Sequence, residues 1–153
     1  MIQRIQSIYL LLATLLTGSL LFLDLANIFG SAGDFVLRFY GIITIVNNET
    51  EVIVPLIAMA FLLITTVFSL FVSVFLYRKR ILQIRLSGIN MGLLTGIVGM
   101  IIYLVIQASK KWEMDYSFTF SIVFPVIALI LVYLAIRAIG KDEALVRSLD
   151  RIR

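Results

Sequence analysis

Residues 52–77 read VIVPLIAMAFLLITTVFSLFVSVFLY, a run of 26 positions without a charged side chain. A helix needs about 20 apolar residues to cross a hydrocarbon core roughly 30 Å thick, so this run has the length of one membrane crossing. Three further charge-free runs have a similar length: Ile5–Leu23, Leu86–Ser109 and Tyr116–Ile136. Together the four runs fill more than half of the 153 residues, and they predict that most of this chain lies in a lipid bilayer.

The composition agrees with a membrane protein and restricts the chemistry. Hydrophobic residues make up 61% of the chain and the mean hydropathy is +1.09, whereas about 45–50% apolar residues is usual in soluble domains. Cysteine and histidine are both absent from the sequence. Their absence excludes disulfides, thiolate chemistry and sulfur-ligated metal sites, together with the commonest acid–base group near neutral pH. We expect no cofactor and no metal.

The charge pattern predicts an all-α membrane protein, a bundle of four transmembrane helices that forms one membrane domain over residues 1–153. The expected segments are spans at about 5–25, 52–77, 87–108 and 118–137, outer loops at 26–51 and 109–117, an inner loop at 78–86 and a cytoplasmic tail at 138–153. Pro55 and Pro125 are expected in the opening turns of the second and fourth helices, where a proline costs a helix little.

One alternative adds a small extracytoplasmic β-sheet to this bundle. In the first connection, Phe35–Tyr40 and Ile42–Val46 are rich in β-branched and aromatic residues, and Gly41 separates them. In the third connection, aromatic and hydroxyl side chains alternate over Tyr116–Ser121, which is the period of a half-buried strand. The competing interpretation starts the fourth helix at Phe118 and forms no sheet. The sequence leaves both open.

The distribution of lysine and arginine predicts how the chain sits in the membrane. The N-terminal stub, the second connection and the segment after the fourth run carry ten basic residues, and the first and third connections carry three. We therefore expect a multi-pass protein with both termini in the cytoplasm. The net charge of +4 is attributed to this topology signal and to attraction by anionic lipid headgroups. No nucleic-acid partner is expected.

The third run carries a helix-packing motif. Four glycines lie on one stripe of the predicted helix, and small residues at such spacing let membrane helices approach closely. We expect the stripe to face small polar residues of the second span. The predicted packing residues are Gly88, Gly92, Gly96, Gly99, Thr65 and Ser69. A homodimer seam and a substrate path are the two alternatives for this stripe. Asn90 projects to the opposite side of the helix, where it is expected to snorkel or to meet a neighbour.

Basic and apolar residues near the predicted cytoplasmic side form a candidate docking surface for a protein partner or for lipid. Its members are Arg78, Lys79, Arg80, Arg85, Lys141, Leu145, Arg147, Leu149, Arg151 and Ile152. Gly140 is expected to kink or hinge the chain before a renewed helix. That helix either lies on the inner headgroup surface or docks onto a protein, and arginine-rich amphipathic helices serve both purposes.

The residue types in the spans restrict the function further. No Asp, Glu, His, Lys or Cys lies within the charge-free runs to serve as an acid, a base or a nucleophile, so we do not expect an enzyme. Asp24, at the edge of the first span, is interpreted as a solvated helix end. The preferred hypothesis is a non-catalytic scaffold or accessory subunit of a membrane complex. The alternative is a transporter or channel for a small solute or an ion, which acts as an oligomer and uses Asn90 and Gln107.

Three segments resemble one family over the whole chain. They are the opening, Met1–Ala13, the inner-loop run, Arg80–Leu86, and the ending, Lys141–Arg153. They resemble an uncharacterised family of four-span integral membrane proteins found in Bacteroidota, catalogued as a domain of unknown function, number 4293. The resemblance implies a protein of the cytoplasmic (inner) membrane of Gram-negative bacteria. It supplies no activity, no substrate and no catalytic residue.

Overall fold

The computed structural model describes residues 3–30, 33–46 and 49–150. Within these ranges the side chains of 3–4, 30, 33, 45–46, 49–50, 78 and 144–150 lie outside the description. The elements, in chain order, are α1 (Gln3–Ser19), β1 (Ala26–Gly30), β2 (Gly33–Arg38), β3 (Gly41–Val46), β4 (Glu49–Pro55), α2 (Ile57–Phe75), the 3₁₀ turn η1 (Leu76–Arg78), α3 (Arg80–Trp112), β5 (Asp115–Phe118), the 3₁₀ turn η2 (Phe120–Ile122) and α4 (Val123–Asp150).

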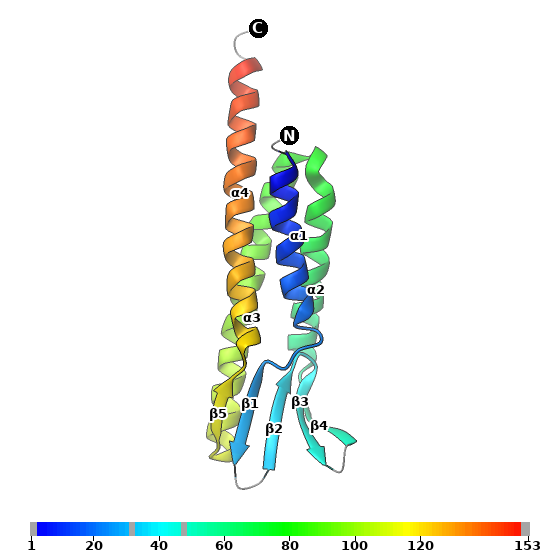
Figure 1. The fold of residues 1–153 in the computed structure, drawn as a ribbon, viewed down its shortest axis with the longest axis vertical. Helices are drawn as coiled ribbons and strands as arrows, with labels where there is room; N and C mark the ends of the chain where they lie inside the picture. The colour runs from blue at the N-terminus through cyan, green and yellow to red at the C-terminus, as the bar shows by residue number, and fades with distance from the viewer. Residues whose placement is uncertain (1–2, 31–32, 47–48, 151–153) are drawn as a thin grey trace.

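The four helices run side by side and the sheet lies at one end of them (Figure 1). Helix α1 packs against α2 and α4, and α3 packs against the same two helices. Helix α1 begins, and α4 ends, at the end of the molecule opposite the sheet (Figure 1). The interior of the helical part is built from fully buried apolar side chains such as Leu10, Leu63, Leu94, Ile101 and Val132.

Three helical segments of the described chain are long and apolar enough to cross a membrane: Ile57–Phe75, Arg80–Trp112 and Phe120–Glu143. Their outward side chains include large apolar ones, such as Phe61 at 72% exposure and Phe68 at 67%. An apolar surface of this kind is rare on soluble proteins and indicates contact with lipid. The chain is therefore a membrane protein. Helix α1 is shorter, with 17 residues, or about 25 Å at 1.5 Å per residue.

A five-stranded antiparallel sheet overturns the all-α prediction. The strand order is β4-β3-β2-β1-β5, and the pairs within it are antiparallel. Four strands come from the first connection and the fifth from the third, so the sheet that the sequence left open is formed from both. The molecule is an α+β protein and not a bundle of four helices alone. The extra strands arise because β-branched residues such as Val52 and Ile53 continue a strand as readily as they begin an apolar helix.

The sheet changes several predicted boundaries. The first span was expected to reach residue 25, but α1 ends at Ser19 and the chain enters β1 at Ala26. Residues 52–55 belong to β4, so Pro55 ends a strand and does not open α2. Helix α3 takes in most of the predicted inner loop. Pro125 lies in the first turn of α4, as predicted.

One face of the sheet packs on the C-terminal end of α3. This helix has 33 residues, or about 50 Å, which exceeds the thickness of the hydrocarbon core. Its last turns run behind the sheet in Figure 1. There the ring of Trp112 stacks on Phe35 of β2 with 5.0 Å between centroids, and Ile28 of β1 and Leu37 of β2 are fully buried. The extra length of α3 therefore supports the sheet.

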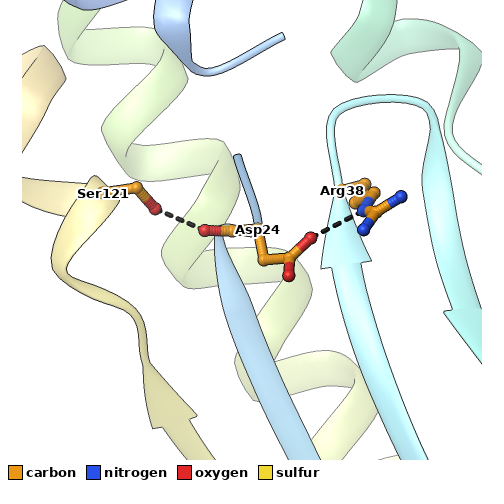
Figure 2. Close-up of polar contacts among 3 residues, drawn as sticks. All are labelled: Asp24, Arg38 and Ser121. Carbon is orange, nitrogen blue, oxygen red and sulfur yellow. Dashed lines mark hydrogen bonds and ion pairs between the residues drawn. The ribbon is translucent and has the colours of Figure 1, made fainter. Parts of the chain in front are cut away.

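Asp24 joins the sheet to the helices (Figure 2). Its carboxylate pairs with the Arg38 guanidinium of β2, with 2.6 Å between Oδ1 and Nε, and its main-chain carbonyl accepts a hydrogen bond from the Ser121 hydroxyl of η2. The hydrogen bond to Asp24 is the main cause that raises the pKa of Arg38, followed by one to Tyr40. The interpretation of Asp24 as a solvated helix end is therefore wrong.

Candidate functional site

The described part of the candidate docking surface gathers at the end of the helices opposite the sheet. Lys79 and Arg80 line a hollow of about 360 Å³ together with Ile81, Leu82 and Glu143. The two cations come from the junction between η1 and α3, and Glu143 comes from α4. The structure therefore brings the predicted inner loop and the beginning of the predicted tail to one place, although about 60 residues separate them in the chain.

A tight connection fixes the cations at this end. Helix α2 ends at Phe75, η1 forms a single turn, and the Lys79 amide donates to the Leu76 carbonyl at 2.9 Å. The main-chain carbonyl of Lys79 then accepts a hydrogen bond from the main-chain N–H of Gln83, in the first turn of α3. No acidic residue lies in the first turn of α3. Lys79 and Arg80 thus add their charge to the positive end of a helix dipole, which costs stability and creates a surface attractive to anions.

Helix α4 carries the second part of the candidate docking surface. It stays helical through Gly140 to Asp150, so the predicted kink at Gly140 is not formed. The helix projects past the ends of the other helices in Figure 1, along its own axis. Lys141 is exposed on it, as Arg85 is on α3. The side chains of Leu145, Arg147 and Leu149 lie outside the description, as do the side chain of Arg78 and the whole of Arg151 and Ile152.

The glycine stripe of α3 faces outward, and the expected packing within the chain is not the arrangement found. Gly88, Gly92, Gly96 and Gly99 are all exposed. A Cβ built on Gly88, Gly92 or Gly99 would meet no atom within 4 Å, and one on Gly96 would lie 4.0 Å from Leu62 of α2. On α2, Thr65 and Ser69 are half-buried.

The polar side chains of α3 explain which face of this helix is buried. Gln83, Ser87 and Asn90 are buried, with at most 1% exposure each. Exposure of an amide to hydrocarbon is costly, whereas an exposed glycine leaves no side-chain polar group unpaired. Helix α3 therefore turns Gln83 and Asn90 inward and the four glycines outward.

These inward residues form a polar cluster with α2. Asn90 Nδ2 donates to the Ser73 hydroxyl at 3.0 Å, and Gln83 Nε2 donates to the Ser73 carbonyl at 3.0 Å. Gln83 Oε1, Ser87 Oγ and Asn90 Oδ1 are buried without a protein partner. The sequence left open whether Asn90 snorkels or meets a neighbour, and it did not predict the cluster. The spacing of 83, 87 and 90 was the available signal, because residues at i, i+4 and i+7 share one helix face.

A second polar region at the end opposite the sheet lies between α1 and α4. Gln6 is 5% exposed, and its amide donates to the carboxylate of Asp142 at 2.5 Å. Arg137 and Lys141 are exposed nearby, where they line a groove together with Asp142. The pairing of Gln6 with Asp142 could not be predicted from the sequence, because 136 positions separate the two residues.

A comparison with curated proteins gives no significant match. A comparison with family models matches residues 2–152 to the model described as "Domain of unknown function (DUF4293)". The match covers almost the whole chain. This protein therefore belongs to the DUF4293 family.

Proposed function

We propose that this protein is a non-catalytic scaffold or accessory subunit of a membrane complex in the cytoplasmic (inner) membrane of Bacteroidota. It crosses the membrane four times, with α1 as the short fourth span, and both termini lie in the cytoplasm. A protein partner docks on its basic cytoplasmic end. The orientation rests on the excess of lysine and arginine in the segments at this end.

One observation carries the proposal. The α2–α3 connection and α4 meet at one hollow, which is lined by the charged Lys79, Arg80 and Glu143 together with the apolar Ile81 and Leu82. Ile81 is 49% exposed and Leu82 45% exposed. A mixture of apolar and charged groups of this kind is typical of protein interfaces, where apolar burial supplies affinity and charge supplies orientation and specificity. The projection of α4 past the other helices makes it accessible to a partner outside the membrane (Figure 1).

The transporter or channel alternative has less support. The polar cluster at Gln83, Ser87 and Asn90 is the observation that favours it. Further along α3, however, the inward residues are Leu94, Ile97, Ile101 and Val105, all fully buried. A polar route would therefore have to form between copies, on the outward face that carries the glycine stripe. Flux of a solute or an ion in proteoliposomes that changes when the exposed Gln107 is altered would support this alternative.

The docking proposal is tested by purification of the tagged protein from its native membrane in mild detergent, followed by crosslinking and mass spectrometry. Deletion of Lys141–Arg153, and separately Lys79→Gln with Arg80→Gln, should remove a stoichiometric partner. The matched control is Lys110→Gln with Lys111→Gln, which neutralises two exposed cations in the last turn of α3, at the end that supports the sheet. If the deletion leaves every co-purifying protein in place, the docking surface is elsewhere.

A further inference from the structure

A groove of about 510 Å³ opens between α1 and α4 at the end of the molecule opposite the sheet. Its apolar wall consists of Ile5 on α1 and of Leu134 and Ala138 on α4. Ile5 is 49% exposed. The apolar segment Phe120–Glu143, which runs from η2 into α4, ends here, and the hydrogen bond from Gln6 to Asp142 places the beginning of α1 beside it. The groove therefore lies where a spanning helix leaves the hydrocarbon core and enters the headgroup layer.

The polar wall of the groove carries charges of both signs. Arg137 and Lys141 are exposed and lie four residues apart, on one face of α4. Asp142 also lines the groove, and the hydrogen bond from the buried Gln6 holds its carboxylate toward α1. The phenol of Tyr9, one turn after Ile5, completes the polar wall. Two cations and one carboxylate thus line the groove beside its apolar wall.

We propose that this groove binds a phospholipid with an ethanolamine headgroup. The phosphate of such a lipid lies between the Arg137 guanidinium and the Lys141 ammonium, which are both strong donors to phosphate. The headgroup ammonium donates to the Asp142 carboxylate, and one acyl chain runs along Ile5 and Leu134. A zwitterion of this type matches the charges of both signs in the groove.

Other phospholipid headgroups match the same wall less well. A choline headgroup carries no N–H, so it cannot donate a hydrogen bond to Asp142. A glycerol headgroup brings no ammonium to the Asp142 carboxylate, and its lipid adds a net negative charge beside it. The proposal goes beyond protein docking and does not depend on it, because the groove shares only Lys141 with the candidate docking surface.

The test is native mass spectrometry of the purified, delipidated protein, titrated with phosphatidylethanolamine, phosphatidylcholine and phosphatidylglycerol of identical acyl chains. One ethanolamine lipid should bind about tenfold more tightly than the choline lipid, which is the size of one charge-assisted hydrogen bond. Asp142→Asn should abolish this preference, because the neutral amide still accepts from Gln6 but no longer attracts an ammonium. Arg137→Gln with Lys141→Gln should weaken binding of all three lipids.

The control variant is Lys79→Gln with Arg80→Gln, which removes two cations from the same end of the molecule but not from the groove. It should keep the affinity and the preference for ethanolamine. Circular dichroism of each variant checks that the helices are intact, and Tyr9→Phe offers a milder change in the same wall. Equal affinity for the three lipids, tighter binding of phosphatidylglycerol, or a preference that survives Asp142→Asn would each overturn the proposal. Because no partner protein is present in this assay, its failure leaves the docking proposal standing.

Discussion

At the scale of single residues, Gly41 is the position in the sheet where a side chain has no room. It follows the turn between β2 and β3. A Cβ built on Gly41 would lie 2.8 Å from the Val54 carbonyl oxygen and 2.9 Å from a methyl carbon of Val52. The backbone of β4 approaches so closely that it would have to move to admit even a methyl group.

We expect Gly41→Ala to destabilise the sheet by about 1–3 kcal/mol, the usual cost of overpacking. The loss of stability is measured by thermal unfolding in detergent, monitored by the fluorescence of Trp112. This is the single tryptophan, and its ring stacks on Phe35 of the sheet. Gly99→Ala is the matched control, since a Cβ there meets no atom within 4 Å and alanine favours a helix. Equal melting temperatures for the two variants would contradict the close approach at Gly41.

At the scale of elements, the pairing of α2 with α3 depends on the polar cluster around Ser73. Asn90→Ala removes the donor to the Ser73 hydroxyl. Interhelical hydrogen bonds in membranes contribute about 1 kcal/mol, so the melting temperature should fall moderately. Gln107→Ala is the control on the same helix, because Gln107 is exposed and its side-chain amide donates to Tyr103, one turn away on α3 itself. The assignment of Asn90 to the interior fails if the control costs as much as Asn90→Ala.

The sequence predicted the helices better than the strands, for a physical reason. Apolar length reports burial in lipid, so α2, most of α3 and the first half of α4 could be predicted from charge-free runs. The hairpin of β2 and β3 was visible because Gly41 interrupts two β-branched runs. Strand β4 was hidden because its second half belongs to the apolar run that was assigned to the second span, and the short β1 carried no strand signal of its own in the predicted loop. Hydropathy does not distinguish an apolar strand from the end of an apolar helix.

The candidate site was predictable in part and by location only. Lys79, Arg80 and Lys141 were expected at one end of the molecule from the distribution of cations, and the structure places them there. The glycine stripe was assigned to the interior, because close packing within the chain is its commonest use. The stripe faces outward because the opposite face, with Gln83, Ser87 and Asn90, is buried instead. Residue spacing defines both faces of the helix but does not show which of them is buried.

At the scale of the whole molecule, the protein has two polar ends of different character. One end is a sheet held by Trp112, Phe35 and the pair of Asp24 with Arg38. The other end carries the exposed cations and the projecting part of α4 (Figure 1). The apolar helices between them fix the distance between the two ends. The proposed function requires that the basic end faces the cytoplasm and the sheet faces outward.

The orientation is best measured by thiol labelling, because the natural chain has no cysteine and each variant carries a single thiol. Lys79→Cys and Lys141→Cys mark the basic end, and Ser117→Cys marks the exposed strand β5. In intact spheroplasts, a membrane-impermeant maleimide should label Ser117→Cys at once and should label the other two variants only after the membrane is permeabilised. Labelling of Lys79→Cys and Lys141→Cys in intact spheroplasts would place the basic end outside and contradict cytoplasmic docking.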